Sequence, residues 1–383
     1  MAVLCKNCSG KLIFNPALQL LECKACGGSF RPEDIRDINA EAHSKYYDTR
    51  VYVCGHCGAE VITNDTEAST LCVYCGNPAI VFSRIAKQRR PDGLIPFKIT
   101  KEQALDRIKN KLFTPLTPKE VKEKATFSNL RGIYVPYWVL NADFTEADYI
   151  TGEISVGRTT IKKHYSRAGS IRFNNVPIDG SKILNDNISM RLEPFNLDEA
   201  KEFDEDYLNG FYSNISDTSY EELKGSAANR CHKIYSDHML KSIPARNAKI
   251  DDSVYWIDIH DDPVYMMMPV WFFSFRYQDK PYTVLVNGQT GEVVGTIPWE
   301  KKQVYKIAGG IFAAVMVTGL ALYSGISFSH AGINGMLNNS ASALTIFGLA
   351  AFPMGLIGIQ NVLKKLSLAQ SEEMFKFVKK RQG

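Results

Sequence analysis

Eight cysteines near the start of the chain carry the strongest chemical signal in this sequence. They form four Cys-x2-Cys pairs in two blocks, which are Cys5, Cys8, Cys23 and Cys26, and then Cys54, Cys57, Cys72 and Cys75. In each block 14 residues separate the two pairs, and the second block repeats the first at an offset of 49 residues. This spacing is typical of zinc ribbons, in which two tight turns bring four thiolates around one ion.

Four thiolates fill the coordination sphere of a tetrahedral Zn²⁺ and leave no position for water. The sequence therefore predicts two structural zinc ions and no catalytic one. Segments this short cannot build a hydrophobic core alone, so metal binding would supply their folding free energy. A disulfide framework and a redox Cys-x2-Cys pair are the alternatives. No basic region followed by an apolar core opens the sequence, so we expect no secretory signal, and a reducing compartment favours metal thiolates.

Charge bears on whether the ribbons bind nucleic acid. Residues 1–80 contain seven Lys/Arg and nine Asp/Glu, a balance of −2. Phosphate binding requires clustered cations, so these ribbons are expected to contact proteins instead. Residues 84–124 are basic, with 12 Lys/Arg and 5 Asp/Glu. That stretch is compatible with lipid head groups, with nucleic acid or with a solvated helix face.

Two uncharged runs of 22 residues, 307–328 and 342–363, occur near the end of the chain. At about 1.5 Å per residue each is long enough to cross a hydrocarbon core of about 30 Å. The loop between them has no Lys, Arg, Asp or Glu, whereas lysines precede the first run and follow the second. The positive-inside rule then places both termini in the cytoplasm. A pair of buried core helices is the alternative.

The middle of the chain shows no phosphate loop, dinucleotide fingerprint or nucleophile elbow, so no enzyme is predicted. Thr100 and Gln103 form a capping-box pattern before a helix whose buried face would include Leu105, Ile108 and Leu112. Asn-Gly at the start of residues 287–291 predicts a β-hairpin between strands at 281–286 and 292–295. We therefore expect an α+β domain with an antiparallel sheet.

A faint internal duplication runs through this domain and suggests two related halves, about 94–180 and 190–300. Residues 96–100 resemble 194–198, and residues 136–139 resemble 269–272. The first match predicts a second helix capped by Asp198, and the second places Trp138 and Trp271 in strands. We expect the aromatic residues of this region to be core: Trp138, Trp256, Trp271, Tyr134 and Phe272.

Two further polar groups invite a chemical interpretation. Cys231, His232 and His238 suggest a third metal site, but they lack a fourth ligand and a firm spacing, which favours an ordinary surface pair. The run His260-Asp261-Asp262 precedes a proline, so a polar turn accounts for it as well as an acid–base role does.

The whole pattern resembles a known family. The tandem ribbons, Tyr-Val-Pro-Tyr-Trp at 134–138, Val-Asn-Gly-Gln-Thr-Gly at 286–291 and the terminal pair of apolar runs resemble the bacterial TFIIB-type zinc-ribbon-containing membrane proteins of Gram-positive bacteria. Some members are encoded beside SPFH-domain and phage-shock proteins, which implies a role as their membrane anchor. The TFIIB label describes the ribbon alone and does not carry over transcription.

The predicted architecture is small zinc ribbons, an α+β domain with an antiparallel sheet, and two transmembrane α-helices. The predicted units are ribbons at 1–30 and 50–80, an α+β cytoplasmic domain at 94–300, membrane helices at 307–328 and 342–363, and a basic cytoplasmic tail at 364–383. The expected function is a membrane-anchored adaptor that recruits cytoplasmic proteins, among which SPFH-domain or phage-shock proteins are candidates. The alternative is a membrane-tethered nucleic-acid-binding regulator that uses the ribbons and the 84–124 stretch, although nucleic acid is the less favoured partner.

Overall fold

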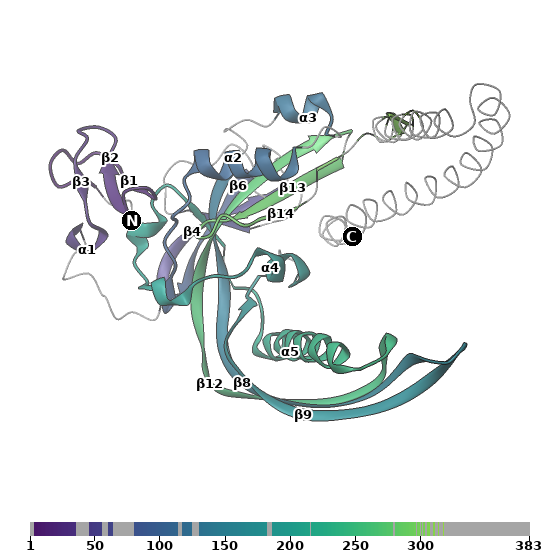
Figure 1. The fold of residues 1–383 in the computed structure, drawn as a ribbon. Coiled ribbons are helices and arrows are strands. Elements are labelled where there is room, and N and C mark those ends of the chain that lie inside the picture. The colour runs from purple at the N-terminus through teal and green to yellow at the C-terminus, as the bar shows by residue number, and fades with distance from the viewer. Residues whose placement is uncertain are drawn as a thin grey trace, which may run out of the picture.

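The computed structural model is rich in antiparallel β-sheet and carries few helices (Figure 1). It describes residues 4–35, 46–55, 60–63, 80–113, 117–124, 130–181, 186–214, 216–278, 280–295, 297–298 and 300, with isolated positions from 302 to 317. The predicted tail at 364–383, the second predicted span and nearly all of the first lie outside the described residues. No helix in the described part of the chain is both long and apolar enough to cross a bilayer.

A small three-stranded sheet forms the first ribbon, with β1 (Leu12–Asn15) next to β2 (Leu20–Cys23) and β2 next to β3 (Ser29–Phe30). Both pairs are antiparallel, and the short helix α1 (Pro32–Ile35) follows. The Asn15 side chain accepts a hydrogen bond of 2.9 Å from the backbone N–H of Ala17, which fixes the turn between β1 and β2.

A second sheet of 11 strands makes up most of the molecule, and its main path runs β10-β7-β12-β8-β11-β5-β4-β6. β9 pairs with β8, and β13 pairs with both β12 and β14. Two of the pairs, β11 with β8 and β12 with β7, are parallel. The strands are β4 (Tyr46–Cys54), β5 (Glu60–Thr63), β6 (Ile80–Arg89), β7 (Gly93–Leu94), β8 (Leu130–Val156), β9 (Thr159–Asp179), β10 (Lys201–Glu202), β11 (Tyr212–Ser213), β12 (Arg246–Tyr277), β13 (Lys280–Asn287) and β14 (Val293–Gly295).

The two central strands, β8 and β12, are 27 and 32 residues long and pair over most of their length. Near Ile133–Leu140 nearly every β8 residue is buried, so both faces of the sheet are covered there. Beyond residue 142 burial alternates along β8, which means that one face is covered and the other is open. We call the second part, formed by residues 142–173 and 246–259, the arm. Figure 1 shows it curving away from the rest of the sheet.

The long helix α5 (Tyr220–Ser242) lies along the concave face of the arm (Figure 1). Its start is fixed by a capping box, in which the Ser219 side chain accepts from the backbone of Glu222 and the Glu222 side chain accepts from the backbone of Ser219. Leu223 and Ala227 of α5 pack with Phe144 of β8 and Ile257 of β12 in one buried cluster. α5 therefore supplies the hydrophobic cover that a bare three-stranded sheet lacks.

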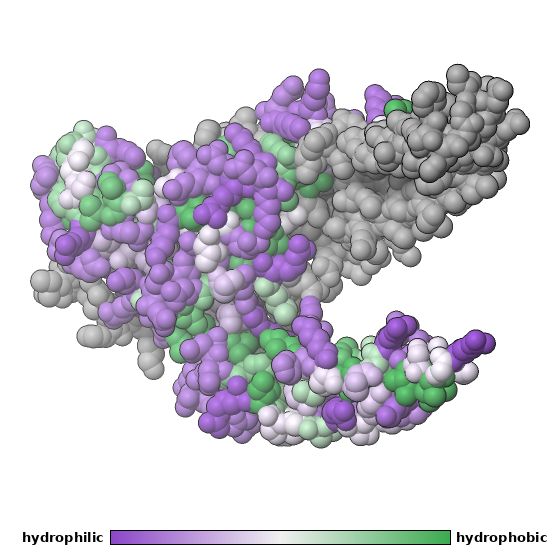
Figure 2. Space-filling model, viewed as in Figure 1, coloured by the Kyte–Doolittle hydropathy of each residue, from purple (hydrophilic) through white to green (hydrophobic). Residues whose placement is uncertain are grey.

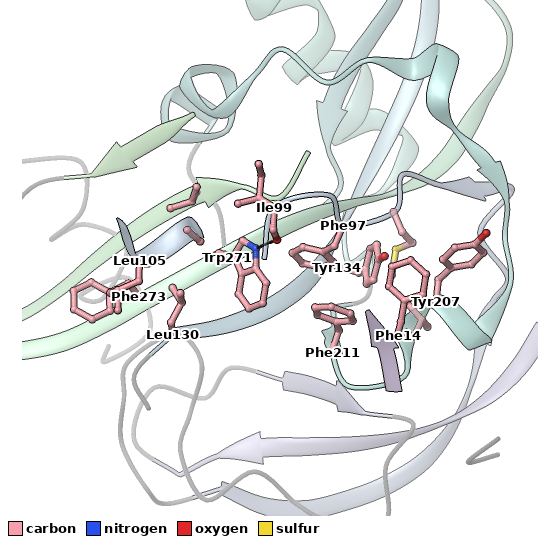
Figure 3. Close-up of a cluster of buried hydrophobic side chains, with 14 of the residues drawn as sticks. Phe14, Phe97, Ile99, Leu105, Leu130, Tyr134, Tyr207, Phe211, Trp271 and Phe273 are labelled. Atoms are coloured by element: carbon pink, nitrogen blue, oxygen red, sulfur yellow. Dashed lines mark hydrogen bonds between the residues drawn. The ribbon is translucent and has the colours of Figure 1, made fainter. Parts of the chain in front are cut away.

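Four buried aromatic rings form the centre of the molecule (Figure 3). Phe97 stacks on Phe211 with ring centroids 4.2 Å apart, and its edges meet Tyr134 and Trp271. The indole Nε1 of Trp271 donates to the backbone oxygen of Ile99 at 2.9 Å, so the buried N–H is satisfied. The same cluster continues into Leu12, Phe14 and Leu21 of the first ribbon, so ribbon and sheet share one core.

Several local predictions are confirmed. Thr100 and Gln103 form a capping box at the start of α2 (Lys101–Leu112), which buries Leu105 and Ile108 and half-buries Leu112. β13 and β14 form the predicted hairpin. The Asn287 side chain accepts from the backbone N–H groups of Gln289 and Thr290 in its turn. Trp138 and Trp271 lie in strands, β8 and β12 respectively.

Two predictions about the second half are wrong. No helix begins at Asp198, because Asn196 caps a single 3-10 turn (Leu197–Glu199) and Ala200 returns to extended backbone before β10. Trp256 is not core, since 72% of its surface is exposed on the open face of the arm. The other short elements are α3 (Lys119–Lys124), α4 (Asp186–Leu192) and a second 3-10 turn (Glu205–Leu208).

Candidate metal centre

The structure brings the four cysteines of the first block together. The sulfur atoms of Cys5, Cys8, Cys23 and Cys26 all lie within 4.8 Å of one another. Cys5 Sγ is 3.6 Å from Cys26 Sγ, and Cys8 Sγ is 3.4 Å from Cys23 Sγ. A disulfide holds its sulfurs at about 2.05 Å, so no disulfide joins these sulfurs. Sulfurs about 2.3 Å from a common ion in a tetrahedron are about 3.8 Å apart, so this donor set could hold a metal ion.

The two knuckles that carry these sulfurs have the same backbone design. The Cys5 oxygen accepts from Ser9 N–H at 2.8 Å, and the Cys23 oxygen accepts from Gly27 N–H at 2.9 Å. Both donor residues have positive φ, +56° at Ser9 and +72° at Gly27. Cys5 N–H and Cys23 N–H then donate to the backbone oxygens of Gly10 and Gly28, five residues further on. Each Cys-x2-Cys pair is thus wound into a tight turn that aims both side chains inward.

Gly10 allows the two knuckles to approach each other. A Cβ at this position would lie 2.8 Å from the Ala25 Cβ and 3.0 Å from the Cys23 Sγ. Any side chain would therefore push the second knuckle away from the first. Glycine is required here by the close packing of the two turns.

Two of the four thiols, Cys8 and Cys23, have shifted pKa values in the absence of an ion. Hydrogen bonding from the backbone of Cys26 lowers the pKa of Cys23 to about 6. A hydrogen bond from the backbone N–H of Gly10 lowers the pKa of Cys8. Hydrogen bonds between the Cys8 sulfur and the sulfurs of Cys23 and Cys26 outweigh that effect and raise the pKa of Cys8 to about 12. Four negative sulfurs repel one another at these distances, so a cation at their centre is what allows all of them to be thiolates.

The ribbon is fixed to the body of the protein by contacts from β1 and from the turn that follows it. Phe14 lies 5.0 Å from Tyr207 between ring centroids, and its backbone N–H donates to Asn209 oxygen at 3.1 Å. Gln19 Nε2 donates to the backbone oxygen of Phe97 at 2.7 Å. Gly210, whose φ is +91°, lies so close to Ile13 that a Cβ on Gly210 would lie 2.6 Å from the Cγ2 of Ile13. The centre is therefore held in a defined position relative to the large sheet.

The second block of cysteines is only partly described. Cys54 ends β4 and is buried, with 1% of its surface exposed. Cys57, Cys72 and Cys75 lie outside the described residues, so the second predicted zinc site stays a prediction. The flanking strands β4, β5 and β6 belong to the large sheet, because β5 pairs with β11 through Ile62 and Ser213.

The suggested third metal group is not brought together. Cys231 is fully buried on the inner face of α5, where burial raises its thiol pKa to about 11, whereas His238 is exposed. His232 instead faces β8, so these three side chains do not form a metal site.

The second polar group of the sequence includes His260, which lies in β12. Its side chain is 2.7 Å from Asp143, and a hydrogen bond from Arg172 lowers the pKa of Asp143. Arg172 of β9, Asp143 of β8 and His260 of β12 thus form a polar network across three strands.

A buried acidic pair under α5 was not recognised in the sequence. Glu146 and Asp148 of β8 have 1% and 3% of their surfaces exposed. Glu146 Oε1 lies 2.8 Å from His232 Nδ1, while Glu146 Oε2 and both Asp148 oxygens have no hydrogen-bond partner within the described chain. Burial and the neighbouring Asp148 raise the pKa of Glu146 to about 7. The only sequence signal is that both acids fall on the inward, alternating face of a strand.

Fold and site together define a β-sheet protein with an N-terminal four-cysteine cluster. The chain is 27% identical over 345 residues to the "Uncharacterized protein YdjG" of Bacillus subtilis (strain 168), an alignment that covers 84% of this chain and 98% of that protein. No protein-family model matches the chain. No solved structure matches it either.

Proposed function

We propose that this protein is a membrane-anchored adaptor whose ribbons and sheet present a docking surface to cytoplasmic proteins. In this proposal Cys5, Cys8, Cys23 and Cys26 bind one Zn²⁺, and Cys54, Cys57, Cys72 and Cys75 bind a second. The apolar runs at 307–328 and 342–363 cross the membrane and keep both termini in the cytoplasm. The chain is then a member of the TFIIB-type zinc-ribbon membrane proteins that its motifs resemble.

The choice of zinc rests on the donor set. Four thiolates in a tetrahedral arrangement suit Zn²⁺ or an iron centre, and a closed four-sulfur site with a Cys-x2-Cys pair on each side is the usual structural zinc site. Two of the sulfurs, Cys8 and Cys26, are exposed, while Cys5 and Cys23 are buried against the shared core. A structural role follows, in which the ion holds the ribbon in shape and the ribbon covers one end of the core.

The observation that best supports an adaptor is the open face of the arm. Trp256 and Val254 of β12 are 72% and 73% exposed, and Tyr149 of β8 is 45% exposed. Thr145 and Ala147, the register partners of Trp256 and Val254 on β8, are small, so the Trp256 and Val254 side chains project above their neighbours on the open, convex face (Figure 1). Exposed aromatic and apolar side chains that gather on one face of a sheet are typical of a protein-binding surface, and tryptophan is among the residues most enriched at binding hot spots.

The nucleic-acid alternative receives less support. A phosphate-binding strip needs cations that are free to face the backbone of a nucleic acid. Several cations of the 84–124 stretch instead form ion pairs within the protein: Arg89 with Asp92, Arg90 with Glu205, Lys98 with Glu199 and Lys111 with Glu292. Arg107 donates to the backbone oxygens of Thr290 and Gly291, which directs its charge toward the hairpin turn.

The test is to recover partners of the tagged full chain from its own host after cross-linking, and to compare the wild type with the double variant Trp256→Ser, Val254→Ser. We expect a cytoplasmic protein, with SPFH-domain and phage-shock proteins as candidates, to co-purify with the wild type and to be lost from the variant. Its membrane localisation should also depend on this chain.

Tyr220→Ser is the matched control, because Tyr220 is an aromatic residue 56% exposed on a different element. It should leave partner recovery unchanged. If no cytoplasmic protein co-purifies with the wild type, or if none leaves the membrane when the chain is deleted, the adaptor proposal is wrong.

A further inference from the structure

The free end of the arm is a sharp β-hairpin that extends beyond the helix covering the rest of it. β8 and β9 pair up to Val156 and Thr159, which leaves Gly157 and Arg158 as a two-residue turn. Gly157 has φ +61°, the conformation that such a turn needs at its first central residue. The link that follows α5 lies near Gly152, where a Cβ would meet Ala245 at 2.6 Å. The third strand, β12, then begins at Arg246, which pairs with Glu153. Residues 154–163, which we call the tip, therefore lie past both the helix and the third strand.

The tip is basic, and its charge faces solvent. Arg158, Lys162 and Lys163 are all exposed, as is Arg167 a short way down β9. None of these four cations forms an ion pair within the described part of the chain. Lys163 and Arg167 lie against the ring of Tyr165, at 5.3 and 5.8 Å from its centroid. Glu153, the register partner of Lys162, accepts a hydrogen bond from Asn247 at 2.9 Å.

The tip also exposes apolar side chains beside these cations. Val156 is 55% exposed and Ile161 is 44% exposed. Ile161 pairs with Ile154, which places the two on one face of the hairpin, the face that α5 covers further down the arm. Figure 2 shows hydrophobic and hydrophilic residues side by side at the free end of the arm. The tip thus combines both kinds of residue that partition into a membrane interface.

Edge protection and nucleic-acid binding each account for only part of this pattern. Cations on a free edge strand prevent edge-to-edge pairing with another sheet, and β9 pairs with β8 alone among the described strands. That role accounts for Lys162 and Lys163 but not for the exposed Val156 and Ile161. A nucleic acid would also attract the cations, and Tyr165 offers its bases a stacking surface, but the exposed Val156 and Ile161 would have no role in such a contact.

We propose that the tip inserts into the head-group region of an anionic lipid bilayer and gives the protein a second membrane contact. The cations bind lipid phosphates, while Val156 and Ile161 enter the boundary with the acyl chains. This inference rests on the proposed membrane anchoring, because the anchor would bring a bilayer within reach of the arm.

The test uses the full chain reconstituted in vesicles of phosphatidylcholine alone, or of phosphatidylcholine with about one third phosphatidylglycerol, and measures hydrogen exchange of the tip. We expect the tip to exchange more slowly in the anionic vesicles, while the first ribbon exchanges equally in both. Each cation near an anionic surface strengthens binding about fivefold, so loss of the two positive charges in Lys162→Glu with Lys163→Glu should weaken tip binding at least about 25-fold (about fivefold twice) and abolish the difference.

The matched control is Lys119→Glu with Lys122→Glu, which makes the same charge change on exposed positions of α3 and should leave tip exchange unaltered. Equal tip exchange in the two vesicles, with the chain retained by both, overturns the inference and leaves the anchoring intact. Protection by a single-stranded RNA oligonucleotide, without protection by anionic vesicles, assigns the tip to nucleic acid and also overturns it. If neutral vesicles do not retain the chain, anchoring fails, and binding to anionic vesicles then reports on the tip directly.

Discussion

The first ribbon and the arm both extend from one central core, but different interactions hold them in shape (Figure 1). The ribbon has strands of only two to four residues and depends on four sulfurs that lie within 4.8 Å of one another. The arm has no such cross-link among its described residues, and it depends on long strands that continue out of the core and on α5 packed along one face. A short segment thus needs a local ion, whereas the register of a long strand is already set by the part of the sheet that it extends.

This comparison predicts that the two regions can be unfolded separately. Cys5→Ser removes one of four metal ligands, and zinc binding contributes about 10–16 kcal/mol to the folding of zinc-finger peptides, more than these short strands can replace. We expect residues 4–30 to lose protection in hydrogen exchange while the arm keeps its protection. The control is Cys231→Ser, which changes the buried cysteine of α5 and should affect the arm alone. A ribbon that stays protected in Cys5→Ser would contradict the role given to the metal.

A substitution in the shared core should affect both regions together. Phe97→Ala removes the ring that stacks on Phe211 and contacts Tyr134 and Trp271. Large-to-small changes of buried aromatic residues lower the free energy of unfolding by about 3–5 kcal/mol. Urea unfolding of the purified chain should show a loss of this size, and Tyr220→Ala, at an exposed position, should change it by less than about 0.5 kcal/mol. An effect confined to one region would mean that the ribbon and the sheet do not share a core.

The acidic pair makes the stability of the arm depend on pH. Glu146 has a pKa of about 7 in the folded chain against an ordinary 4.5. The folded state therefore binds the proton more tightly, and its contribution to stability is full below about pH 4.5 and is lost as pH rises through about 7. Glu146→Gln resembles the protonated acid, so we expect it to stabilise the packing of α5 on β8 by about 2 kcal/mol at pH 8 and to have little effect at pH 5.

Thermal unfolding and hydrogen exchange of α5 across pH 5–8 measure this effect. The control is Glu153→Gln, an acid on the same strand that lies outside the buried pair. It should leave the pH profile unchanged. An identical profile for the wild type and Glu146→Gln would show that burial does not raise the pKa of Glu146.

The smallest effect distinguishes the two capped helices. Ser219→Ala removes the cap of α5, and Thr100→Ala removes the equivalent cap of α2. Each should lower the free energy of unfolding by about 1 kcal/mol. Hydrogen exchange should locate the first effect in the arm and the second near the aromatic core. If Ser219→Ala destabilised both regions equally, the arm would not behave as a separate unit.

The features that could be predicted from sequence depend on residues close together in the chain. The Cys-x2-Cys spacing, the Thr100 capping box and the Asn287 turn are local patterns, and the structure contains the corresponding local elements. The antiparallel character of the sheet also followed from the hairpin. The second zinc site and the membrane spans were predicted from equally local patterns and stay predictions.

The features that were missed depend on distant contacts. The inner face of α5 combines Leu223, Ala227, Cys231 and Tyr235 with polar neighbours, so its hydrophobic periodicity is weak. His232 meets Glu146 across 86 residues of chain, which no spacing rule connects. Trp256 was expected in the core because tryptophan usually is, but whether the second face of a strand is covered depends on the rest of the fold. The arm leaves that face open.

The most direct test of the account is the metal content of the full chain, purified without oxygen and measured by inductively coupled plasma mass spectrometry. We expect two zinc ions per chain in the wild type and one in the double variant Cys5→Ser, Cys8→Ser. A chain that is folded but holds no zinc, or holds iron in its place, would contradict the zinc-ribbon assignment on which the adaptor proposal is built.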